Sequence, residues 1–166
     1  MKRRFRIVEL VLACLVTGYF FAACEEHHLI NGKDMSFKAG KPLKGDIHIG
    51  AYNMADETLT LYDDANQDAV YARVTRNQPI KWLIDNTDDM KDFEIVGIKE
   101  DTSFPNAPDF FSQVPANNGN HWAAQVHDEG HLDPAKGFLE KYVITWRIKG
   151  RPKTYTCDPI MQLNPR

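Results

Sequence analysis

A short stretch in the second half of the chain holds the densest group of residues that could bind a metal ion. The candidate ligands in it are His121, His127, Asp128, Glu129 and His131. Imidazole nitrogens and carboxylate oxygens are ligands that Zn²⁺ takes in proteins. A ligand pair four residues apart needs a helix to bring both side chains to one face, but Gly130 and Pro134 favour a loop here. We therefore interpret the stretch as a solvated polar loop, with zinc binding as the alternative.

A second candidate set lies near the C-terminus, in Tyr155-Thr156-Cys157-Asp158-Pro159-Ile160-Met161. This segment is similar to the Tyr-x-Cys-x-Pro-His…Met ligand loop of small cupredoxins. Residues 80–95 resemble the strand, Asn/Asp-rich turn and strand that carry the first copper-binding His of that family. The resemblance implies a Greek-key sandwich and, through Cys157 and Met161, a copper site.

The two histidine ligands of such a copper site are missing. Asp92 stands in the place of the first, and no His follows His131. Because a blue-copper centre needs two His, a Cys thiolate and a weak axial Met, we carry over the fold but not the electron-transfer role. Cys157 is interpreted as a small buried hydrophobic residue. Copper binding stays as an alternative, and we expect no cofactor.

Few residues have the pattern of a catalytic nucleophile. Ser36, Ser103 and Ser112 have no nucleophile-elbow setting, and Cys157 has no basic neighbour in sequence to lower its pKa. No Gly-rich phosphate loop is present. Spacing leaves paired carboxylates for glycoside hydrolysis open, but a chain of this size leaves little room for a deep sugar cleft. We predict that the protein is not an enzyme, with a small envelope hydrolase as the second alternative.

Charge and size argue against two further classes: nucleic-acid-binding proteins and multidomain proteins. The chain has 166 residues and a net charge of −3, and its basic N-terminus makes the remainder more acidic still. Phosphate binding needs a surplus of clustered Lys and Arg, so nucleic acid is not an expected partner. The length is that of one ordinary domain.

The N-terminus has the pattern of an export signal. Basic residues at positions 2–6 precede an apolar run over 7–21, which is shorter than the roughly 20 residues of a membrane-spanning helix. The run ends at Phe21-Ala22-Ala23-Cys24, which resembles the lipobox of bacterial lipoproteins. That resemblance implies cleavage before Cys24 and acylation of its thiol with palmitate-type chains. The alternative is an ordinary secretory signal cut after Ala22 or Ala23.

Lipidation at Cys24 predicts a protein held in the cell envelope. Several acyl chains at about 0.8 kcal/mol per buried methylene make attachment effectively permanent. Glu25-Glu26 resembles tags that send some lipoproteins to the outer membrane or cell surface, and the sequence leaves open whether the domain faces the periplasm or the exterior. Cys14 would be discarded with the signal, so Cys157 would be the only remaining thiol.

The rest of the chain divides into two parts. Residues 24–45, with several Gly and a Pro, predict the lipidated Cys and a flexible tether. The domain is expected over residues 46–166, where apolar residues alternate with polar ones. The expected strands are residues 47–52, 58–62, 70–75, 80–84, 93–98, 121–126, 142–148, 154–156 and 160–163.

Helix signals are weak, and short helical turns are expected only near residues 63–68 and 133–138. Eight or nine short strands separated by Asn-, Gly- and Pro-rich loops predict an all-β, Greek-key β-sandwich of the immunoglobulin-like or cupredoxin-like kind.

The expected loop over residues 101–119 is long and carries aromatic side chains. Phe104, Phe110 and Phe111, joined by Trp122, are candidates for contact with an envelope protein or a small ligand. The alternative is that the loop folds back and caps the core. We predict a lipid-anchored, non-catalytic binding module whose partner the sequence does not identify.

Overall fold

The structure of the protein is a computed structural model that describes residues 25–30, 33–38, 40–104, 110–128 and 139–163. For residues 25–38 it describes the backbone alone. Within these ranges the chain forms strands and one short 3-10 helix, η1 (Asp88–Met90). No helix among them is long and apolar enough to cross a membrane.

The strands are short and follow one another closely along the chain. They are β1 (Glu25–Ile30), β2 (Lys33–Lys38), β3 (Lys41–Pro42), β4 (Ile47–Asn53), β5 (Thr58–Asp63), β6 (Tyr71–Val74), β7 (Pro79–Ile84), β8 (Phe93–Glu100), β9 (Phe111–Asn117), β10 (Trp122–Val126), β11 (Leu139–Ile148), β12 (Thr154–Cys157) and β13 (Ile160–Leu163).

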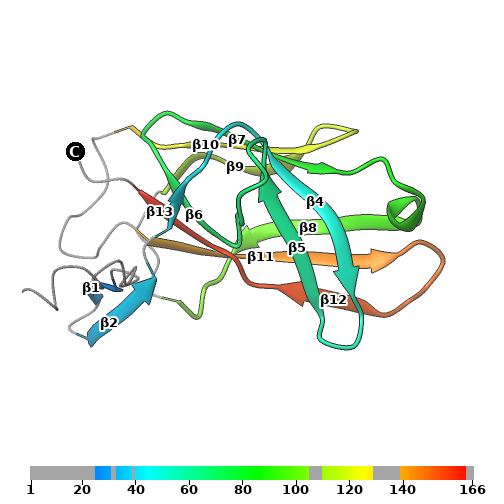
Figure 1. The fold of residues 1–166 in the computed structure, drawn as a ribbon, viewed down its shortest axis with the longest axis horizontal. Helices are drawn as coiled ribbons and strands as arrows, with labels where there is room; N and C mark the ends of the chain where they lie inside the picture. Colours follow the sequence, from blue (N-terminus) through cyan, green and yellow to red (C-terminus); the bar gives the residue numbers. More distant parts are fainter. Residues whose placement is uncertain (1–24, 31–32, 39, 105–109, 129–138, 164–166) are drawn as a thin grey trace, which may run out of the picture.

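Two mixed sheets form the layers of a β-sandwich (Figure 1). The first has the order β5-β4-β7-β10-β9, and the second has the order β12-β11-β13-β6-β3, with β8 on the free side of β11. The pairs β4–β7, β6–β13 and β3–β6 are parallel. The predicted all-β sandwich is therefore confirmed.

The long strand β11 organises the second sheet. Tyr142, Ile144, Trp146 and Ile148 are buried and alternate with more exposed residues, as the period of a half-buried strand requires. A turn leads from β11 back into β12. Gly150 in this turn has φ 77°, a left-handed backbone conformation that glycine adopts without steric cost. This C-terminal hairpin was also predicted.

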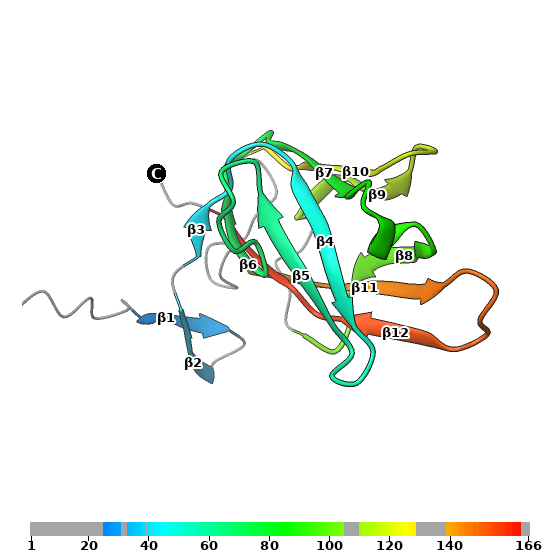
Figure 2. The same ribbon diagram turned by 45° about the vertical axis from the view of Figure 1, so that its right-hand side comes forward.

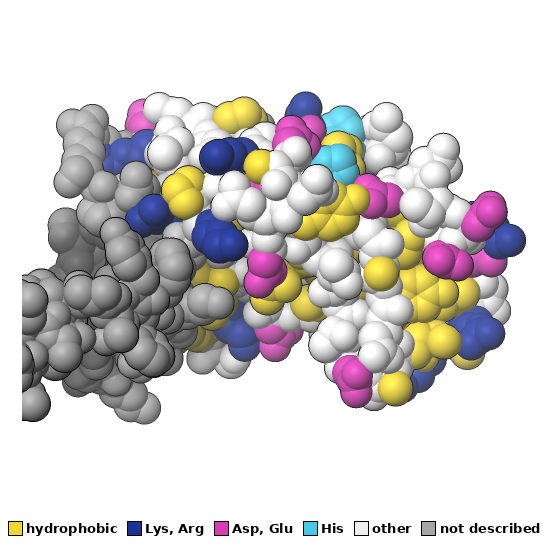
Figure 3. Space-filling model, in the orientation of Figure 1, with side chains coloured by type: hydrophobic (Ala, Val, Ile, Leu, Met, Phe, Trp, Pro, Cys, Tyr) yellow, Lys and Arg dark blue, Asp and Glu magenta, His cyan; other side chains and the backbone are white. Residues whose placement is uncertain are grey.

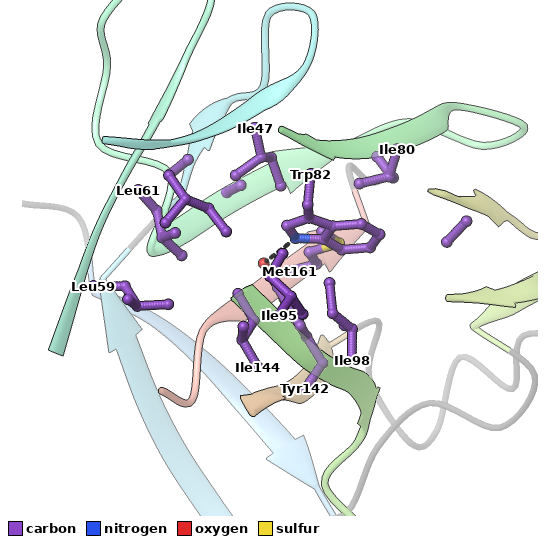
Figure 4. Packing of buried hydrophobic residues seen from close by; sticks show 14 of the residues in the cluster. Ile47, Leu59, Leu61, Ile80, Trp82, Ile95, Ile98, Tyr142, Ile144 and Met161 are labelled. Atoms are coloured by element: carbon purple, nitrogen blue, oxygen red, sulfur yellow. Dashed lines mark hydrogen bonds between the residues drawn. The ribbon is translucent and has the colours of Figure 1, made fainter. Parts of the chain in front are cut away.

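The core fills the space between the two sheets. Trp82 from the first sheet is fully buried, and its indole N–H donates to the hydroxyl of Tyr142 in the second sheet at 3.3 Å (Figure 4). Met161 and Ile144 from the second sheet lie in the same cluster. An aromatic contact of this kind adds about 0.5–1.5 kcal/mol to the burial of the rings.

Three parts of the chain differ from the predicted elements. Residues 111–117, expected in a loop, form β9, and the expected tether contains β1, β2 and β3. The helical turn expected over residues 63–68 is wrong: Oδ1 of Asp63 accepts the backbone N–H groups of Ala65 and Gln67, both at 2.9 Å. An aspartate that binds the backbone ahead of it favours a turn over a helix. Residues 133–138 lie outside the described residues.

Candidate functional site

A groove of about 480 Å³ lies beside β8, between this strand and the hairpin of β9 and β10. β8 ends the second sheet and β9 ends the first, so both strands lie along one side of the sandwich (Figure 2). The groove is lined by Trp82, Ile84, Phe93, Glu94, Ile95, Val96, Asn117, Gly119, Asn120, His121, Trp122, Arg147 and Lys149.

Strand register explains how the floor of the groove forms. Trp82 on β7 pairs with Trp122 on β10, and Trp122 pairs with Asn117 on β9. Residues directly opposite one another in a sheet share a face, so this row runs from the core towards the edge of the sandwich. Trp82 is fully buried, whereas Trp122 is only half-buried. The outer end of the row is therefore accessible to a ligand.

The opposite wall of the groove comes from β8 and β11. Glu94 lies opposite Arg147 in the sheet, and its carboxylate accepts a hydrogen bond from Nε of Arg147. Lys149 Nζ donates to the carbonyl of Lys91 at 3.0 Å. Val96, at an irregularity in the pairing, is 45% exposed. This wall therefore combines a neutralised ion pair with a small apolar surface.

The tip of the β9–β10 hairpin has a well-defined shape. Oδ1 of Asn117 accepts the N–H of Gly119 at 2.7 Å, and Gly119 has φ 92°. The N–H of Asn118 donates to the carbonyl of His121 at 2.9 Å, and Nδ1 of His121 lies 2.7 Å from Oδ1 of Asn120. These contacts hold the polar side chains beside Trp122 in fixed positions, as a preorganised binding site requires.

The residues predicted as metal ligands lie in different surroundings. His121 lines the groove, His127 pairs with Asp128 at 3.2 Å, and His131 lies outside the described residues. Met161 is fully buried in the core; Cys157 packs against that core, and burial raises the pKa of its thiol. Among the described residues, no three His, Cys, Asp or Glu side chains meet in a metal-binding arrangement.

The predicted contact aromatics also separate. Phe110 is fully buried and Phe111 is 6% exposed, with their rings in edge-to-face contact. Both rings belong to the core and are closed to a partner. Phe104 is half-buried, and Trp122 alone of the four lines the groove. Cys24 lies outside the described residues.

A second polar cluster, which the sequence did not indicate, lies on the outer face of the first sheet. His48 Nε2 is 2.8 Å from Oδ1 of Asp64, and His48 Nδ1 is 3.1 Å from Oδ1 of Asp85. Tyr62 donates its hydroxyl to Asp85 and stacks on the His48 ring at 5.2 Å. Figure 3 shows histidine and acidic side chains next to one another near the top of this face.

The electrostatics of this cluster favour a charged imidazole. Partial burial lowers the pKa of His48, but the hydrogen bonds to Asp64 and Asp85 outweigh it, so that this pKa is raised. The hydrogen bond from His48 lowers the pKa of Asp64, and the hydrogen bond to Asp85 raises the pKa of Tyr62. Both imidazole nitrogens are engaged, so His48 offers no open nitrogen for acid–base chemistry.

A third polar group lies inside the second sheet. Glu140, on β11, is fully buried, and neither carboxyl oxygen has a hydrogen-bond partner among the described residues. Burial, reinforced by the charges of Glu100 and Asp101, raises the pKa of this carboxyl group to about 9. Glu140 therefore keeps its proton at neutral pH, as expected of a buried carboxyl group with no cationic partner in the described part of the chain.

No protein-family model matches the chain, and a comparison with curated proteins finds no match. The case for a function therefore comes from the residues and their geometry.

Proposed function

We propose that this chain is a lipid-anchored protein of the bacterial cell envelope that binds a partner, without catalysis, through the groove beside β8. The observation that carries the binding role is Trp122: a half-buried indole that packs against the core and lines the groove. Half-exposed aromatic side chains beside fixed polar groups are typical of binding sites.

The charges in the groove support binding over catalysis. Its carboxylate, Glu94, is engaged by Arg147, and its lysine, Lys149, by a backbone carbonyl. General acid–base catalysis needs a group that can exchange a proton with a substrate. The groove combines these engaged charges with amide side chains and with His121, whose Nδ1 contacts Asn120, and such groups orient a ligand through hydrogen bonds.

The N-terminal sequence supports the envelope location. The basic segment, the apolar run and Phe21-Ala22-Ala23-Cys24 follow one another in the order that a lipoprotein signal requires. Metabolic labelling of the full chain in a bacterial host with an alkynyl palmitate analogue tests this part. We expect labelling of the wild type and none of Cys24→Ala. Equal labelling of the two would exclude this anchor.

Sedimentation with isolated cell envelopes tests the binding role. The chain with Cys24→Ala, purified without its signal sequence so that it carries no acyl chains, should be retained in the pellet. This acyl-free chain serves as the wild type in the binding assays, because acyl chains would hold every variant in the membrane. Trp122→Ala should reduce retention, whereas Thr60→Ala should leave it unchanged, because Thr60 is exposed on β5 at the opposite edge of the same sheet. Equal retention of both variants would show that the groove is not the contact site. No retention of the wild type would refute envelope binding.

A further inference from the structure

We infer that the groove beside β8 binds an uncharged oligosaccharide chain of pyranose rings. This inference rests on the proposed function, since it names the chemical class of ligand for the same site. Three features of the groove support it: an aromatic surface, planar polar side chains beside that surface, and the absence of a dominant charge among its described residues.

The aromatic surface is the indole of Trp122. A pyranose ring with equatorial hydroxyl groups has a flat face of C–H bonds, whose slightly positive hydrogens are attracted to the negative face of an aromatic ring. Trp122 lies between Trp82 and Asn117 in the row and packs against the core, so the core side of its ring is supported. The half of the residue that remains exposed faces the groove.

Planar polar side chains surround this indole. Asn117, Asn120 and His121 come from the hairpin, and the Glu94–Arg147 pair comes from the opposite wall. Amide, carboxylate and guanidinium groups each present donors or acceptors in a fixed plane, which suits neighbouring hydroxyl groups on a sugar ring. The second carboxylate oxygen of Glu94 and the terminal nitrogens of Arg147 extend this set, because the hydrogen bond between the two side chains uses only Oε1 and Nε.

The balance of charges argues against a strongly ionic ligand. Glu94 and Arg147 neutralise each other across the sheet, so that Lys149, which donates to the carbonyl of Lys91, contributes a single remaining positive charge. A polyanion or a polycation would be attracted by a wall of a single opposite sign. A neutral chain of hydroxyl-bearing rings does not depend on such a wall, so the balance of charges does not weaken its binding.

The shape of β8 argues against an added peptide strand. An extended peptide binds a sheet edge through a regular ladder of backbone hydrogen bonds. Here the β8–β11 pairing is irregular at Val96, between the pairs Thr145–Gly97 and Trp146–Ile95. Bulges at an edge strand twist it away from new partners and are a known means of preventing strand addition.

The decisive experiment treats the isolated envelopes before the same acyl-free chain is added. Sodium periodate cleaves the carbon–carbon bond of vicinal diols and so destroys sugar rings; it is quenched and washed away before binding is measured. A second portion of the envelopes is digested with a protease, which is then inhibited. We expect retention of the wild type to be lost after periodate and kept after protease.

Three variants connect that result to the groove. Trp122→Ala should weaken retention about tenfold, whereas Trp122→Phe, which keeps an aromatic face, should stay within about threefold of the wild type. Asn120→Ala, at the exposed tip of the hairpin, should weaken it about fivefold through the loss of an amide. This last change removes no core contact, so its effect cannot come from unfolding.

The outcomes separate the two proposals. Retention that survives periodate but is lost after protease would overturn the oligosaccharide and leave a protein-binding module. Sugar-dependent retention that is equal in Trp122→Ala, Asn120→Ala and the wild type would place the sugar site elsewhere and overturn this assignment. Absence of retention on untreated envelopes would refute the proposed binding function itself.

Discussion

Two polar sites on opposite sheets have contrasting surroundings. One is the cluster around His48, and the other is the carboxyl group of Glu140. His48 has a carboxylate at each ring nitrogen, and Asp85 also accepts a hydrogen bond from Tyr62. Glu140 is fully buried, and its oxygens have no hydrogen-bond partner among the described residues. The first cluster shares charge among several groups on the surface, whereas the second group avoids charge by keeping its proton.

This difference shows which polar groups stabilise the fold. A partly exposed network gains about 1 kcal/mol from each hydrogen bond, because water competes for the partners. A buried carboxyl group costs free energy whenever its charged form is favoured in the unfolded chain. We therefore expect substitutions at Glu140 to stabilise the protein and substitutions around His48 to destabilise it.

The largest expected effect is that of Glu140→Gln. The pKa of Glu140 is raised from 4.5 to about 9, so between these values the folded protein holds a proton that the unfolded chain has released. Stability from this group therefore falls as pH rises through that window, by up to about 1.4 kcal/mol per pH unit. Gln mimics the protonated acid, and it should raise the free energy of unfolding at pH 7 by roughly 3 kcal/mol.

Urea unfolding of the full chain at pH 5 and pH 8 measures this effect. The gain from Glu140→Gln should be small at pH 5 and larger at pH 8. Glu57→Gln is the matched control, because Glu57 is exposed in the turn between β4 and β5 and is not one of the charges that raise the pKa of Glu140. A gain for Glu140→Gln that does not change with pH would show that Glu140 is ionised in the folded protein.

The next effect in size is that of Asp85→Ala. This change leaves His48 Nδ1 and the Tyr62 hydroxyl without the carboxylate that both contact. The expected loss is about 2 kcal/mol at pH 6, from two hydrogen bonds to a charged, partly buried group. Thermal unfolding measures it, and Asp88→Ala, at an exposed position in η1, is the control. A loss equal to that of the control would mean that the cluster contributes nothing to stability.

The pH dependence of His48 comes next. Its folded pKa is raised above the unfolded value, so the stability from its charge is fully present below about pH 6.5 and is lost as pH rises through the folded pKa. His48→Gln should therefore cost about 1 kcal/mol at pH 5.5 and less at pH 9. Chemical unfolding at the two pH values gives the comparison. A cost that grows with pH would contradict the assignment of a stabilising positive charge to His48.

The sequence predicted much of the fold because the main strands show clear alternation. In β11 every second residue from Tyr142 to Ile148 is buried, so a period of two was visible. In β9 only Phe111 is buried and Pro115 interrupts the pattern, so that strand looked like a loop. Its place depends on pairing with β10, which local sequence does not encode.

The groove and the two polar sites were less predictable, for a related reason. Trp122 was a candidate from its residue type, but Glu94 and Arg147 line the same groove only because β8 pairs with the distant strand β11. Likewise, His48 and Asp85 meet only because β4 and β7 lie side by side. Glu140 precedes Lys141 at the start of a strand, and nothing in those residue types indicates that one is buried while the other pairs with Asp101 at 2.9 Å.

The smallest effect is expected for Tyr62→Phe. This variant tests whether the stability of the His48 cluster depends on each of its hydrogen bonds. Phe keeps the ring that stacks on His48 and removes only the hydroxyl that donates to Asp85. Asp85 keeps His48 as a partner and is partly open to water, so the loss should be about 0.5 kcal/mol. Unfolding of Tyr62→Phe, Asp85→Ala and the double variant measures the coupling between the two side chains. A loss as large as that of Asp85→Ala would mean that the Tyr62 bond, and not His48, holds Asp85 in place.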